Sequence, residues 1–171
     1  MMASGHSTAV PGGMNNTRCR RHRAPGRTLH LIDIENVAGG SRASTAAVAE
    51  AVADYRCALA VRAGDHVVIA SGRGLLIAAG LAWPGARLLL ASGLDGADLA
   101  LLEAARPLRA VVDSYDRVVI GSGDGIFAAL AADLRRAGLV VVVVSRPVAL
   151  AIDLRDRASL VRRLPSATLV A

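Results

Sequence analysis

The sequence contains no lysine and few aromatic residues. All 20 basic side chains are arginine, and Phe, Trp and Tyr together make up 2% of the chain. Without lysine there is no P-loop of the G-x-x-x-x-G-K-[ST] type. So few aromatic rings argue against binding by base stacking. The hydrophobic fraction of 53% must therefore build its core from small aliphatic side chains.

Cysteines and long hydrophobic runs are also scarce. The two cysteines, Cys19 and Cys57, have no spacing typical of zinc and fit a reducing compartment. No apolar run approaches the roughly 18 residues that a membrane span requires, and the N-terminus lacks the apolar core of a signal peptide. We therefore expect a cytoplasmic protein without a membrane segment. Met14 is an alternative start residue.

Charge is distributed unevenly along the 171 residues. Residues 1–26 are rich in Gly, Ser, Asn, Pro and Arg without periodicity, which is typical of a disordered arm. Five Arg and no acid lie in residues 1–27, which leaves 15 basic and 14 acidic residues in the remainder. The net charge of +6 thus belongs mainly to the arm. We predict one folded domain over residues 27–171, with a size ordinary for a single core.

Apolar runs of strand length alternate with helical patterns from residue 28 onward. The predicted strands are residues 28–34, 66–70, 86–91, 117–120 and 139–144, and the predicted helices lie within 44–59, 74–82, 96–105 and 125–137. This alternation predicts a three-layer α/β/α fold, with an open parallel sheet of about five strands in the common order 3-2-1-4-5. For the tail we expect a closing helix with Leu154, Leu160, Val161 and Leu164 on one face, and an edge strand at 167–171.

Acidic and polar residues follow two strands of this predicted sheet. Asp33, Glu35 and Asn36 follow the first strand, and Ser122 and Asp124 follow the fourth. Ligands of such sheets bind outside the carboxyl ends of the strands. In the order 3-2-1-4-5 the first and fourth strands are neighbours, so the two aspartates are expected to face each other.

A second acidic pair, Asp95 and Asp98, opens the helix after the third strand. Residues three apart can share one side of the first helical turn. Carboxylates gathered closely repel one another unless a cation offsets their charge. Oxygen ligands without His or Cys favour Mg²⁺ or Mn²⁺, and such a metal can support phosphodiester hydrolysis.

Helix capping is the alternative role for these acids. Asp124 and Asp95 are each placed to cap a following helix, and Asp98 to interact with a helix dipole. Asp33 has no helix-start pattern nearby, which favours a ligand role. The glycines at 121, 123 and 125 lack the G-x-G-x-x-G spacing of a dinucleotide site, because residue 126 is Ile. Histidines 30 and 66 receive no role.

Three motifs together resemble the NYN domain, a branch of the PIN-like nuclease superfamily. They are L-I-D-I-E-N at 31–36, G-A-D-L-A-L at 96–101 and V-I-G-S-G-D-G-I-F at 119–127. The resemblance covers about residues 28–163 and implies a PIN-like fold with metal-dependent RNA cleavage. It implies that Asp33, Asp98 and Asp124 are the acidic metal ligands, with Asn36 and Ser122 beside them.

One position departs from the NYN pattern. Many family members carry a second Asp where this chain has Ile126, so Glu35 and Asp95 are candidate substitutes. Two other functions stay open: a catalytically silent RNA-binding or regulatory module, and a phosphatase with an Asp nucleophile. Ala- and Val-rich helix faces are compatible with a homodimer, although no surface is indicated.

Overall fold

The structure is a computed structural model that describes residues 26–93, 95–147 and 149–165. Its centre is a six-stranded parallel sheet in the order β3-β2-β1-β4-β5-β6. The strands are β1 (Thr28–Asp33), β2 (His66–Ser71), β3 (Arg87–Leu90), β4 (Arg117–Gly121), β5 (Val140–Ser145) and β6 (Leu160–Arg163). Residues 1–25 of the predicted arm and the predicted strand at 167–171 lie outside the described residues.

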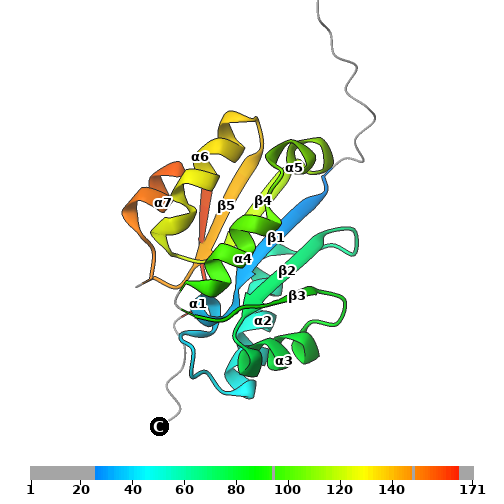
Figure 1. Cartoon of the computed structure of the whole chain (residues 1–171), viewed down its shortest axis with the longest axis vertical. Helices are drawn as coiled ribbons and strands as arrows, with labels where there is room; N and C mark the ends of the chain where they lie inside the picture. The colour runs from blue at the N-terminus through cyan, green and yellow to red at the C-terminus, as the bar shows by residue number, and fades with distance from the viewer. Residues whose placement is uncertain (1–25, 94, 148, 166–171) are drawn as a thin grey trace, which may run out of the picture.

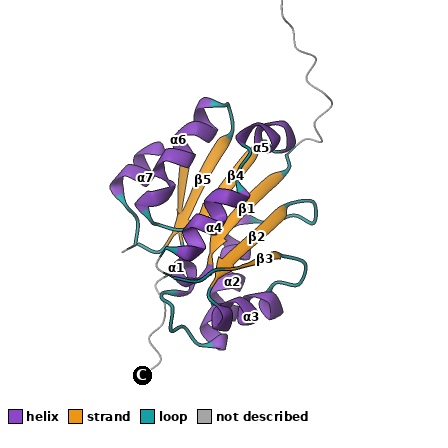
Figure 2. Ribbon diagram, in the orientation of Figure 1, coloured by secondary structure: helices purple, strands orange, loops and turns teal. Residues whose placement is uncertain are grey.

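Helices cover both faces of the sheet (Figures 1 and 2). On one face lie α1 (Ile34–Ala38), α2 (Thr45–Leu59) and α3 (Arg73–Ala82), which share one hydrophobic core with the sheet. On the other lie α4 (Gly96–Ala104), α5 (Leu108–Ser114), the 3₁₀ turn η1 (Gly125–Phe127), α6 (Ala128–Arg136) and α7 (Ile152–Arg157), around a second core. The predicted three-layer fold is confirmed.

The predicted strand order is also confirmed, with β6 added beyond β5. β1 pairs with β2 on one side and β4 on the other, so it is central, and all six of its residues are buried. β5 lies between β4 and β6, and apart from exposed Val140 its residues are buried. The strand predicted from five consecutive valines is therefore interior because a sixth strand covers its edge.

The predicted closing helix is wrong. Of its four apolar positions, only Leu154 lies in a helix, α7, while Leu160 and Val161 form part of β6. The chain becomes extended at Ala158, and β6 then pairs in parallel with Val142–Ser145 of β5. Backbone pairing with a buried strand thus outweighs a helical spacing of apolar residues.

The first strand is one residue shorter than predicted. It ends at Asp33, and Ile34 begins the short helix α1. Nowhere in the described ranges is there a helix with both the length and the apolar character needed to cross a bilayer.

Candidate metal site at the carboxyl edge of the sheet

Asp33 occupies the junction of β1 and α1. Its backbone is extended, and its Oδ1 accepts hydrogen bonds from the N–H groups of Glu35 (3.0 Å) and Asn36 (3.4 Å). Asp33 is therefore a helix N-cap, so the expectation that no helix begins near it was wrong. The N-cap uses one carboxylate oxygen and leaves Oδ2 for other chemistry.

The carboxyl group of Asp33 is held in an unfavourable electrostatic environment. The residue is 7% exposed. Burial, followed by the negative charge of Asp98, raises the pKa of Asp33 to about 7, although the two N–H donors act in the opposite direction. A carboxyl group that is half protonated at neutral pH gains from a nearby cation.

Asp98 lies in the first turn of α4. It belongs to an acidic cluster whose charges act on one another, formed by Asp33, Glu35, Asp95, Asp98 and Asp124. It is 8% exposed, and its buried Oδ1 has no hydrogen-bond partner among the described residues. Burial, followed by the charges of Asp124, Asp95 and Glu35, raises the pKa of Asp98 to about 6. A buried carboxylate oxygen without a donor is costly, so this atom marks a place for a cation or a proton.

Asp124 and Ser122 shape the turn after β4. The exposed carboxylate of Asp124 accepts from the N–H of Ile126 (2.9 Å), so its predicted capping role is confirmed. The buried hydroxyl of Ser122 accepts from the N–H of Asp124 (3.2 Å). The charge of Asp124 still acts on Asp98, so capping and membership of the acidic cluster coexist.

Asp95 does not cap α4. It has a left-handed backbone with φ +56°, and its side chain makes no capping hydrogen bond. The expected cap is therefore wrong, because this backbone geometry is not that of an N-cap. Its charge, like that of Glu35, acts on Asp98.

Two polar side chains tie neighbouring loops together at this edge. Asn36 Oδ1 accepts from the N–H of Gly123 (3.0 Å), which joins helix α1 to the loop after β4. Glu35 Oε1 accepts from the Ser71 hydroxyl (3.1 Å) and the Gly72 N–H (3.2 Å) at the end of β2. Sequence reasoning missed Ser71, although its place at a strand end before Gly72 was a usable signal.

The donor chemistry of the cluster fits a hard divalent cation. Its donors are carboxylate oxygens, two of its acids have raised pKa values, and no described residue is a partner of Asp98 Oδ1. Within the described residues, however, no group of three or more acidic, His or Cys side chains already has the spacing to hold an ion.

Comparisons with known proteins bear on the fold alone. No family model and no curated protein matches the chain. Among solved structures, it is similar to the crystal structure of a protein of unknown function from Vibrio parahaemolyticus. The two share 18% identity with a TM-score of 0.61, over 83% of this chain and 94% of the other.

Proposed function

We propose that this chain is a ribonuclease of the NYN type that hydrolyses RNA phosphodiester bonds with Mg²⁺ or Mn²⁺ held by Asp33, Asp98 and Asp124. The observation that carries the proposal is the buried Oδ1 of Asp98, which has no hydrogen-bond partner in the described part of the chain and lies in an acidic cluster. The cluster lies at the carboxyl edge of a parallel sheet, where ligands of such folds bind. The motif resemblance supports the same assignment.

The proposed chemistry divides between the cation and the chain. When bound, a divalent cation would supply an activated water and stabilise charge on a phosphoryl oxygen. Asp33 is fixed through Oδ1 by two backbone N–H groups, which leaves Oδ2 to bind the cation or hold a proton. Asn36 links helix α1, which Asp33 caps, to the loop that carries Asp124. Glu35 adds charge beside the site while Ser71 and Gly72 hold it in place.

Cleavage of a mixed set of labelled single-stranded and structured RNAs tests the proposal, with Mn²⁺, Mg²⁺ or EDTA. We expect metal-dependent products that fall by about 100-fold or more in Asp98→Asn and Asp124→Asn, since even outer-shell changes cost about 10- to 100-fold at metal sites. Asp113→Asn is the matched control, because this exposed acid pairs with Arg109 on α5. Full activity in Asp98→Asn would contradict the proposal.

A catalytically silent RNA-binding or regulatory module is the second candidate. Ile126 favours it, because this side chain packs against the second hydrophobic core at a position where family members carry an acid. The incomplete three-ligand geometry among the described side chains points the same way. Calorimetric Mn²⁺ binding, together with intact RNA across the whole set, would favour this module over the enzyme.

The proposal extends to location and assembly. We infer a cytoplasmic protein, where the exposed thiol of Cys57 stays reduced, and a homodimer is the assembly to test. Sedimentation velocity of the purified chain, with and without a reducing agent, separates a native dimer from a Cys57-linked one.

A further inference from the structure

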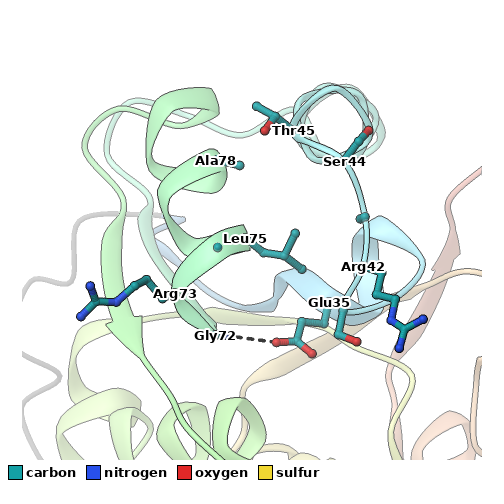
Figure 3. Close-up of a pocket in the computed structure, with 11 residues that line it drawn as sticks. Glu35, Arg42, Ser44, Thr45, Gly72, Arg73, Leu75 and Ala78 are labelled. Atoms are coloured by element: carbon teal, nitrogen blue, oxygen red, sulfur yellow. Dashed lines mark hydrogen bonds between the residues drawn. The ribbon is translucent and has the colours of Figure 1, made fainter.

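The acidic cluster has no basic partner in the described part of the chain. The ion pairs among the described residues all join other acids to His30 or to an arginine. Arg42 and Arg73 line a hollow together with Glu35. Figure 3 shows them on either side of Glu35, with guanidinium groups directed away from its carboxylate. No described basic side chain therefore pairs with the cluster.

Asp98 supplies a second observation, which points to a cationic ligand. The residue is 8% exposed, and its Oδ1 has no hydrogen-bond donor among the described residues. Because a buried carboxylate oxygen without a donor is costly, a group that donates a hydrogen bond and carries positive charge would stabilise it. A guanidinium does both, since it holds N–H donors in a planar fork and stays protonated.

The N-terminal arm of the chain contains such groups. Residues 18–23 read Arg-Cys-Arg-Arg-His-Arg, and the first acid of the sequence is Asp33. The arm therefore has no carboxylate of its own that could neutralise its arginines. The arm and the acidic cluster are complementary in charge, which favours their association.

The length of the arm decides whether this contact is possible. Thr28 begins β1 at the amino edge of the sheet, and Asp33 ends it at the opposite edge, near α1 (Figure 1). This part of β1 spans roughly 17 Å at about 3.3 Å per residue, whereas the chain from Arg18 to Thr28 extends to roughly 33 Å. The difference of about 16 Å exceeds the diameter of a helix, about 10–12 Å. Arg18 can therefore pass over one helix and reach the cluster.

The chain turns at the point where the arm joins the domain. Gly26 has a φ of +89°, in the left-handed region that favours glycine. Its N–H donates to Asp116 Oδ2 (3.0 Å), which fixes the turn on the domain. The arm therefore does not start as a straight continuation of β1 away from the sheet.

We propose that Arg18 and Arg20 of the N-terminal arm bind the acidic cluster of their own chain when no metal is bound. The inference rests on the proposed function and adds regulation to the same site. The guanidinium groups supply the donor that Asp98 Oδ1 lacks among the described residues. A divalent cation has to displace them, so the arm raises the Mn²⁺ concentration that the nuclease requires.

A spin label on Cys19 tests the contact directly, because Cys19 lies between the two arginines. The full chain carries the label in a Cys57→Ser background, which removes the exposed second thiol. In EDTA we expect paramagnetic broadening of the amide resonances of Gly96 and Gly123, which lie close to two cluster acids along the chain.

The broadening should depend on the cluster. We expect it to disappear in the double variant Asp98→Asn, Asp124→Asn. It should persist in the control Asp113→Asn, whose exposed acid pairs with Arg109 on α5. Saturating Mg²⁺ should also remove it, because the cation and the arm compete for the same oxygens. Broadening that is absent in EDTA, or that survives the loss of both cluster acids, would overturn the inference.

The Mn²⁺ affinity measures the competition. By calorimetry we expect Arg18→Gln, Arg20→Gln to bind Mn²⁺ about tenfold more tightly than the parent, which corresponds to an arm bound in about 90% of metal-free molecules. The matched control Arg109→Gln, Arg136→Gln removes the same charge from exposed arginines of α5 and α6 and should leave the affinity unchanged. Arg23→Gln should also have little effect, because its shorter tether to β1 leaves no length for passing over a helix.

The outcomes separate this inference from the proposed function. If the parent cleaves RNA but shows no broadening in EDTA, the arm does not bind the cluster and the nuclease stands. If the broadening depends on the cluster acids but no metal binds and no RNA is cleaved, the nuclease fails and the arm stands as the partner of the cluster. An arm variant that loses RNA affinity at unchanged Mn²⁺ affinity would show that the arm binds RNA instead, and would overturn the inference.

Discussion

His30 and Tyr55 share a buried hydrogen bond, with His30 Nδ1 3.0 Å from the Tyr55 hydroxyl, between central strand β1 and helix α2. The other ring nitrogen, Nε2, lies 3.6 Å from Asp65 Oδ2. Burial lowers the pKa of His30 to about 4, although the charge of Asp65 opposes this effect. The imidazole is therefore neutral in the folded protein at neutral pH.

Acid should weaken the fold through His30. Its pKa is lower in the folded state than its ordinary value of 6.5, so the unfolded chain binds the proton first, and stability is lost as pH falls from about 6.5 to 4. The shift corresponds to about 3 kcal/mol. Urea unfolding of the parent and of His30→Gln gives the free energy of unfolding of each between pH 7.5 and 4.5. The loss is the fall in the parent's free energy that the variant does not share. An imidazole that titrates near pH 6.5 by NMR would contradict it.

Asp33 should have the opposite effect on the metal-free protein. Its pKa is raised from 3.8 to about 7, so the folded state holds the proton more tightly, and a penalty builds up as pH rises from about 4 to 7. We expect Asp33→Asn to be more stable than the parent at pH 8 by about 2–4 kcal/mol. Asn still caps α1. The difference should disappear near pH 4, as followed by denaturant unfolding in EDTA; a constant difference across this range would rule out the charge explanation.

Gly123 leaves no room for a side chain. A Cβ there would collide with the Ala149 carbonyl oxygen and lie 2.5 Å from Ser145 Oγ, whereas a Cβ at Gly125 would make an ordinary 3.5 Å contact with Ala151. We expect Gly123→Ala to lower the unfolding free energy by about 1–3 kcal/mol and Gly125→Ala to change it much less. Parallel urea titrations compare the two, and equal stability would show that the loop after β5 shifts freely.

Asn36 should control the opening of the loop after β4. Loss of its hydrogen bond in Asn36→Ala should weaken protection of the Gly123 N–H by about 1 kcal/mol, or roughly fivefold in hydrogen exchange. Asn36→Asp keeps an acceptor at this position and should keep most of the protection. The bond is unimportant for the loop if both variants exchange at the parent rate.

The sheet could be predicted because its strands are apolar runs separated by helical periodicity. Three elements were not predicted, the helix α5 (Leu108–Ser114), the strand β6 and the helix α1, and the last two escaped for identifiable physical reasons. β6 is short and half exposed, and it carries Arg162 and Arg163, so it lacks the pattern of a strand. α1 is only five residues long, and its start depends on Asp33, whose place after an apolar strand indicates a metal ligand more readily than a helix cap.

The sequence predicted which residues form the candidate site better than it predicted how their side chains are arranged. Strand order placed Asp33 and Asp124 after neighbouring strands, and the charges of Asp98 on Asp33 and of Asp124 on Asp98 show that Asp98 lies at the same edge. No sequence pattern, however, gave the bond from Gly123 to Asn36 or the lack of a donor to Asp98 Oδ1 among the described residues. Both depend on how loops from distant parts of the chain pack against each other.

The two outer strands of the sheet leave it with unequal protection against aggregation. β6 ends in two exposed arginines after exposed Leu160, whereas β3 carries exposed Leu88 and Leu90 after exposed Arg87 and contacts α3, which exposes Ile77 and Leu81. Charged side chains on an edge strand repel a foreign strand, and apolar ones invite it. Partly unfolded molecules should therefore aggregate first through β3. The substitution Leu90→Lys should raise the protein concentration at which aggregation begins.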